Sequence, residues 1–282
     1  MFKNTKKIIL ALLVIYFIII TIFTLISIQQ VNQLKKGPST GLTTFLSLQI
    51  GGAYNNIILQ IIQFILIPLL NSGLFIYLKN NNSFIAIQQR TGYRNFLITG
   101  ILFSFIGGAI IMLLTYLLQL ALITIFCAPI VFYVDPHLAD MGIQYFSLNT
   151  GLELASFILL SSIGWGIFSI LVFSISLFIP KNIICLLTGV LVALILIISP
   201  LVGNMQNSIW RIISFIWFLP TIIAPGQMTF NSMAPPINFI FAYFIGIALY
   251  ISIALLLITS WSKRKQGGYA WEHEIESFLF QF

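Results

Sequence analysis

Six long apolar stretches constrain this chain more than any other feature of its sequence. They cover residues of about 8–28, 57–78, 97–126, 151–179, 182–202 and 237–260. An α-helix needs roughly 20 apolar residues to cross the hydrocarbon core of a bilayer, and each stretch is long enough. Only 7% of the residues are charged, against about a quarter in soluble domains. We therefore expect an all-α membrane protein with six transmembrane helices and no soluble domain.

The first apolar stretch is expected to be a retained membrane span. Lys residues precede it, as in a signal peptide, but the run from Ile8 to Ile28 is longer than the usual signal core of about 7–15 residues. No small-x-small cleavage site follows it. The second stretch contains Pro68 and Asn71, which a membrane helix tolerates when neighbouring helices satisfy the freed backbone groups.

The distribution of Lys and Arg predicts the orientation. With the N-terminus inside, the inner segments carry ten of these residues: Lys3, Lys6, Lys7, Lys79, Arg90, Arg94, Lys181, Lys263, Arg264 and Lys265. The outer segments then carry three: Lys35, Lys36 and Arg211. Since inner loops are enriched in Lys and Arg, we expect both termini in the cytoplasm. The abundance of Ile, Phe, Asn and Lys is typical of AT-rich bacterial genomes, which favours the bacterial plasma membrane.

Motifs for chemistry are missing from the sequence. There is neither a G-x-x-x-x-G-K-[ST] phosphate loop nor an H-E-x-x-H zinc motif. His137 and His273 are predicted on opposite sides of the membrane, and Cys127 and Cys185 are far apart in apolar surroundings. We expect no catalytic, metal or cofactor site in this chain, and no clustered basic face for nucleic acid. A membrane acyltransferase would need an acid–base set that the sequence does not offer.

Three acidic residues, Asp135, Asp140 and Glu153, are predicted at the outer side. Glu153 falls in the first turn of a span, where a carboxylate complements the helix dipole. The alternative is that all three form an outer acidic patch for a cationic cargo. Both interpretations stay open from the sequence.

Residues 203–236 are mostly apolar and aromatic, yet Pro220 and Pro225 interrupt them before a full span is reached. We expect a re-entrant or interfacial pair of short helices that lines a lateral or outward opening. Three of its side chains suit the headgroup level of a membrane: Trp210, Arg211 and Trp217.

The inner loop of residues 79–96 is a short basic and polar segment between two spans. Its middle part combines apolar and polar side chains: Phe84, Ile85, Ile87, Gln88, Gln89 and Arg90. Gly92 then breaks it, and Arg94 leads into the third span. The segment is either a short helix that transmits motion to the helices it joins or a plain positively charged connector.

After Gly267 and Gly268, apolar residues recur at helical spacing: Trp271, Ile275, Phe278, Leu279 and Phe282. We expect a separate amphipathic helix in this cytoplasmic tail, 263–282. It can lie on the membrane or dock on a partner, and its three Glu residues favour a protein partner.

Small and hydroxyl side chains line one face of two spans: Gly107, Gly108, Thr115 and Gln119 in one, and Ser161, Ser162, Gly164 and Gly166 in the other. Such residues allow close helix packing. The alternative interpretation is a weakly polar pathway at a subunit interface.

Three features together resemble the membrane subunit of ABC-2 type ABC transporters. They are the six spans with both ends inside, the loop Gln88-Gln89-Arg90-Thr91-Gly92-Tyr93-Arg94, and the apolar segment between the last two spans. In that family the loop between spans two and three is a coupling helix seated in a groove of a separate ATPase. The resemblance therefore implies that Phe84 to Arg94 contact ABC ATPase subunits, which bind ATP and Mg. It also implies a second permease subunit, identical or related.

The chain departs from the family at two places. Only about seven residues precede the first span, where many members have a longer amphipathic helix, and Gln88 and Gln89 stand where an acidic residue is often found. Small bacterial members resemble exporters of peptides, bacteriocins or antibiotics. We expect a permease for an amphipathic or hydrophobic cargo, because the spans are mostly apolar with scattered hydroxyls. The alternative is a non-transporting scaffold or sensor whose tail docks a cytosolic regulatory protein.

Overall fold

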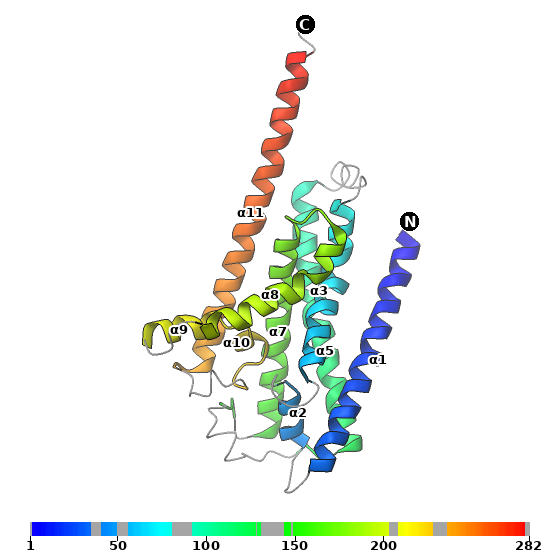
Figure 1. Cartoon of the computed structure of the whole chain (residues 1–282), viewed down its shortest axis with the longest axis vertical. Coiled ribbons are helices and arrows are strands. Elements are labelled where there is room, and N and C mark those ends of the chain that lie inside the picture. Colours follow the sequence, from blue (N-terminus) through cyan, green and yellow to red (C-terminus); the bar gives the residue numbers. More distant parts are fainter. Residues whose placement is uncertain are drawn as a thin grey trace.

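The structure, a computed structural model, describes residues 2–34, 41–49, 56–80, 92–127, 129–130, 144–147, 149–202, 208–227 and 236–279. In these ranges all regular structure is helical (Figure 1): α1 Phe2–Leu34, α2 Gly41–Gln49, α3 Asn56–Asn80, α5 Tyr93–Phe126, α7 Thr150–Ser176, α8 Asn182–Val202, α9 Ser208–Trp217, α10 Pro220–Ile223 and α11 Phe239–Leu279. Six of them (α1, α3, α5, α7, α8 and α11) are long and apolar enough to cross a membrane. The prediction of an all-α protein with six such helices is confirmed.

Helix α7 is the centre of the bundle. In its apolar window 72% of the residues are buried, against 17% in α1. Its closest neighbour is α5, and small residues permit the approach: Gly108 of α5 packs on Ser169, and Gly166 of α7 packs on the Phe105 carbonyl. The small-residue faces are thus turned into the bundle of this chain, as the packing interpretation predicts.

Helix α8 crosses α3 at a proline. Pro68 lacks an N–H, so the carbonyl of Phe64, four residues earlier, has no partner of the usual helical kind. Gly189 of α8 lies directly against that carbonyl, where a Cβ atom would collide with it. The proline and the glycine together set where α8 meets α3.

Buried polar side chains join the helices at two successive turns of α5. The Tyr16 hydroxyl of α1 is 2.8 Å from Thr115 Oγ1 of α5. One turn further along α5, Gln119 Oε1 accepts a hydrogen bond of 2.9 Å from Gln49 Nε2 of α2. Such bonds are favourable in an apolar setting, where an unpaired polar group is costly.

The sequence does not predict helix α2, which lies between the first two predicted spans. It is too short to span, yet Leu42, Phe45 and Leu46 are buried. The Phe45 ring lies edge-on to Tyr116 of α5 and Phe157 of α7. Helix α2 is therefore part of the buried core and is not a surface connector.

Helix α10 packs against the middle of α7, and α9 packs against α8, α10 and α11. Ser161 of α7 donates a hydrogen bond to the Ile223 carbonyl, and Gly164 leaves the room that the Ile222 carbonyl occupies. The hydroxyl of Tyr250 in α11 donates to the Trp217 carbonyl at 2.6 Å. In Figure 1, α9 lies across α11. The predicted pair of short helices is thus present at 208–223.

Helix α11 differs from the prediction at its C-terminal end. It runs without interruption through Gly267 and Gly268 to Leu279, where the sequence had suggested a separate tail helix. At 41 residues it is about 60 Å long, and its last part extends away from the other helices (Figure 1).

Candidate functional site

One end of the bundle, which we call the basic end, carries Lys79, Arg94, Lys181 and Arg264. There Lys79, in the last turn of α3, caps α7. Its ammonium donates to the carbonyl oxygens of Ser176 at 3.1 Å, Leu177 at 2.8 Å and Ile179 at 2.9 Å. The last carbonyls of a helix lack intrahelical partners and carry the negative end of its dipole. A single cation therefore fixes the end of α3 to the end of α7.

Two further contacts complete this place, which we call the basic-end junction: Lys79, Asn80, the turn 177–181, Asn182 and Arg264. Asn80 Nδ2 donates to Asn182 Oδ1, the first residue of α8, at 2.7 Å. The Arg264 guanidinium lies 5.5 Å from the centre of the Phe178 ring, a cation–π distance. Helices α3, α7, α8 and α11 are thus joined within a few residues.

An apolar cluster underlies the junction. Its buried members come from four helices and the turn after α7: Ile76, Phe96, Leu97, Phe173, Leu177, Ile258 and Trp261. Because buried packing resists small shifts, a displacement of the end of α3 is passed to α5, α7 and α11.

The chain leaves the junction at Asn80 and enters residues 81–91. The predicted coupling residues lie there, outside the described residues: Phe84, Ile85, Ile87, Gln88, Gln89 and Arg90. The chain returns at Gly92, whose φ of 74° is one that glycine adopts without steric cost. Arg94 follows in the first turn of α5 and is exposed. The coupling role of these residues stays a prediction.

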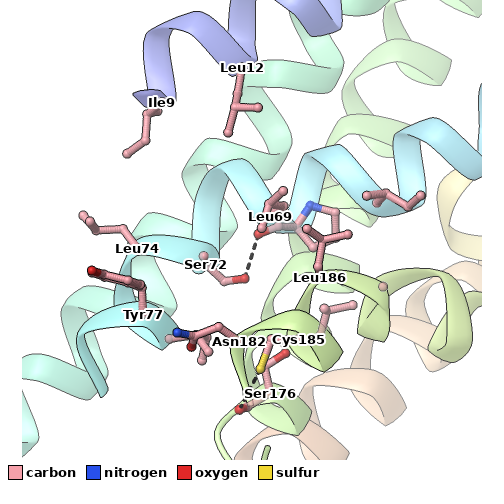
Figure 2. Close-up of a pocket in the computed structure, with 16 residues that line it drawn as sticks. Ile9, Leu12, Leu69, Ser72, Leu74, Tyr77, Ser176, Asn182, Cys185 and Leu186 are labelled. Atoms are coloured by element: carbon pink, nitrogen blue, oxygen red, sulfur yellow. Dashed lines mark hydrogen bonds between the residues drawn. The ribbon is translucent and has the colours of Figure 1, made fainter. Parts of the chain in front are cut away.

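Beside the junction lies a half-open cavity of about 520 Å³ (Figure 2). Helix α3 forms its floor, with α1 on one side and α8 on the other. Its walls are mostly apolar: Ile9, Leu12, Ile65, Pro68, Leu69, Ile76, Val172 and Leu186 are among the lining residues.

Three polar side chains of the cavity contact other parts of the protein. Ser72 Oγ donates to the Pro68 carbonyl at 2.7 Å, and the Cys185 thiol lies 3.7 Å from the Ile179 carbonyl. Asn182 accepts from Asn80, and Tyr77 is 41% exposed at the same end. The cavity therefore offers an apolar interior with a polar rim at the basic end.

Glu153, at the opposite end of α7, is completely buried. Its Oε2 accepts hydrogen bonds from the backbone N–H groups of Phe146 at 2.6 Å and Ser147 at 3.1 Å. Asn149 caps the same helix through its side chain. This geometry fits the helix-dipole interpretation of Glu153, which holds segment 144–147 over the helix end. The acidic patch stays a prediction for Asp135 and Asp140, which lie outside the described residues.

The other predicted residues lie apart from the junction. In α9, Trp210 is 57% exposed and Arg211 is half-buried, while Trp217 Nε1 donates to Ser199 Oγ at 3.1 Å. Pro220 begins α10, and both Pro220 and Pro225 are buried. Of the tail residues, Trp271, Ile275, Phe278 and Leu279 belong to α11, but their side chains are outside the described part, as is Phe282.

The sequence did not reveal the junction. Lys79 was interpreted only as a topology signal, because nothing local indicates that its partners are carbonyls about 100 residues later. In the described ranges, no group of three or more His, Cys, Asp or Glu side chains could hold a metal ion.

Comparisons with protein-family models, curated proteins and solved structures find no match to this chain. The proposed function therefore rests on the geometry of the structure.

Proposed function

We propose that the chain is a permease subunit of an ATP-driven ABC exporter in the bacterial plasma membrane. In this proposal the basic end faces the cytoplasm, residues 84–94 contact a separate ATPase that binds ATP and Mg, and two permease subunits form the transport unit. The segment 208–227 is re-entrant from the outer side.

The observation that carries the proposal is the basic-end junction. Lys79 and Asn80 end α3 directly before residues 81–91, and they grip the turn between α7 and α8. A push on the loop would therefore move the most buried helix of the bundle. A plain connector needs no such attachment, so the junction favours the transmitting interpretation of the loop.

The apolar cavity beside the junction supports an amphipathic or hydrophobic cargo, such as a peptide, bacteriocin or antibiotic. No buried ion pair or acidic side chain lies in the middle of the described spans. Coupling of transport to ATP hydrolysis thus fits the described spans better than coupling to an ion gradient.

Affinity purification of the full chain from its native membrane tests the proposal. We expect an ATPase to co-purify and its Mg-dependent ATP turnover to fall several-fold with Arg90→Ala plus Arg94→Ala. The matched control is Lys263→Ala, an exposed cation of α11, which should leave turnover unchanged. Absence of an ATPase, or equal turnover in both variants, would contradict the proposal.

The uninterrupted α11 favours a second candidate, a non-transporting scaffold or sensor. The 15 residues from Lys265 to Leu279 extend the helix by about 22 Å, which is the form of a docking arm. Removal of residues 265–282 separates the two functions. A scaffold would lose its partner, whereas a permease that contacts its ATPase through residues 84–94 would keep it.

A further inference from the structure

The cavity between α1, α3, α7 and α8 has the size of a ligand site. Its volume of about 520 Å³ falls in the range of about 300–1,000 Å³ that is typical of small-molecule pockets. Figure 2 shows side chains of α1, α3 and α8 converging on it, with Ile9 and Leu12 facing Leu69 and Leu186. An apolar ligand buries more of its surface in a concave site of this kind than on the convex outer faces of the spans, and it is therefore held more tightly.

The cavity is about as long as one leaflet of a bilayer is thick. Its lining residues on α3 run from Ile65 to Tyr77, about 18 Å along the helix. Half of the hydrocarbon core is about 15 Å. The occupant that fits this shape in a membrane is one extended acyl chain, lying along α3.

The charges near the cavity indicate that the head group attached to the acyl chain is anionic. Two exposed lysines are close in sequence to lining residues at the basic end: Lys7 lies two residues before Ile9, and Lys181 directly precedes Asn182. Among the described residues, none that lines the cavity is acidic. Lysines near a membrane surface attract anionic head groups.

We propose that this cavity binds one acyl chain of an anionic amphiphile, with the chain along α3 and the head group between Lys7 and Lys181. The amphiphile enters from the leaflet at the basic end. The proposed site is formed by this chain alone. The binding proposal and the transporter function can therefore fail independently of each other.

The test uses the full chain in discs of phosphatidylcholine and a palmitate that carries a photoreactive diazirine. We expect adducts on residues 9–12, 65–77 and 182–189, and we expect unlabelled palmitate to suppress them in a saturable manner. Leu186→Trp, which fills the cavity, should lower labelling about tenfold, as loss of several buried methylenes does. Its matched control is Leu194→Trp, also on α8: the two leucines are 41% and 43% exposed, and Leu194 lies outside the cavity lining.

A second experiment tests whether the head group must be anionic. A probe with the same chain and a neutral hydroxymethyl head should label about fivefold less. Lys181→Gln should remove most of this preference, whereas Lys263→Gln at the same end should keep it.

Three results would overturn the proposal. They are adducts spread evenly over the exposed faces of all spans, labelling that unlabelled palmitate does not suppress, and equal labelling by the anionic and neutral probes. Competition on the unaltered chain keeps the test decisive if Leu186→Trp does not fold.

Discussion

At the scale of single residues, we expect the substitution of Lys79 to destabilise the chain more than that of any other cation at the basic end. Its ammonium donates three hydrogen bonds to carbonyls at and just after the C-terminal end of α7. Hydrogen bonds to a charged group contribute about 1.5–3 kcal/mol, so Lys79→Met should destabilise the chain by about 2 kcal/mol. The measurement is the shift of the unfolding temperature in detergent.

Lys181→Met is the control for that measurement. Lys181 lies at the same end and is exposed, and surface substitutions of this kind stay within about 0.5 kcal/mol. Equal shifts for both variants would show that Lys79 acts only through net charge.

A second residue-scale prediction concerns Gly164. A Cβ atom there would meet the Ile222 carbonyl of α10, so Gly164→Ala must push α10 from α7 at a cost of about 1–3 kcal/mol. Gly151→Ala in the same helix is the control, since its nearest new contact is at 3.5 Å. The same unfolding measurement checks both, and an unchanged Gly164→Ala would contradict the observed packing.

At the scale of elements, the sequence predicted the helices better than their contacts. The predicted spans match the helices to within a few residues, apart from the longer ends of α1 and α11, because apolar length decides what can cross lipid. Helix α2 escaped prediction because nine residues are too few for that criterion, although Leu42, Phe45 and Leu46 repeat at helical spacing. The hydrogen bonds from Lys79 to the end of α7 were not predicted, because they join parts of the chain that only the fold brings together.

The junction makes an element-scale prediction about movement. A short bis-methanethiosulfonate crosslinker should join Asn80→Cys to Asn182→Cys, in a chain with Cys127→Ala and Cys185→Ala, because the two side chains are already in contact. If α3 moves against α8 during transport, this crosslink should lower the ATP turnover of the co-purified complex several-fold and a reductant should restore it. The Asn80→Cys single variant is the control, and turnover that is indifferent to a formed crosslink would contradict transmission through this junction.

At the scale of the whole molecule, one bundle end carries Lys79, Arg94, Lys181 and Arg264, while the buried carboxylate of Glu153 lies at the other end. Helix α1 begins and the extension of α11 ends at the basic end (Figure 1). Since positive residues stay on the cytoplasmic side, we predict that this end is inside. Gly151 and Lys181 mark the two ends of the α7 region, and both are exposed.

A pair of single cysteines tests this orientation in intact cells, again with both native cysteines replaced by Ala. A membrane-impermeant maleimide should label Gly151→Cys directly and Lys181→Cys only after the cells are permeabilised. Gly151→Cys leaves the helix start undisturbed, because its new Cβ meets nothing closer than 3.5 Å. The reverse labelling pattern would place residues 81–91 outside, where no cytosolic ATPase can reach them. That single result would remove the permease function while leaving the junction and the cavity as they are.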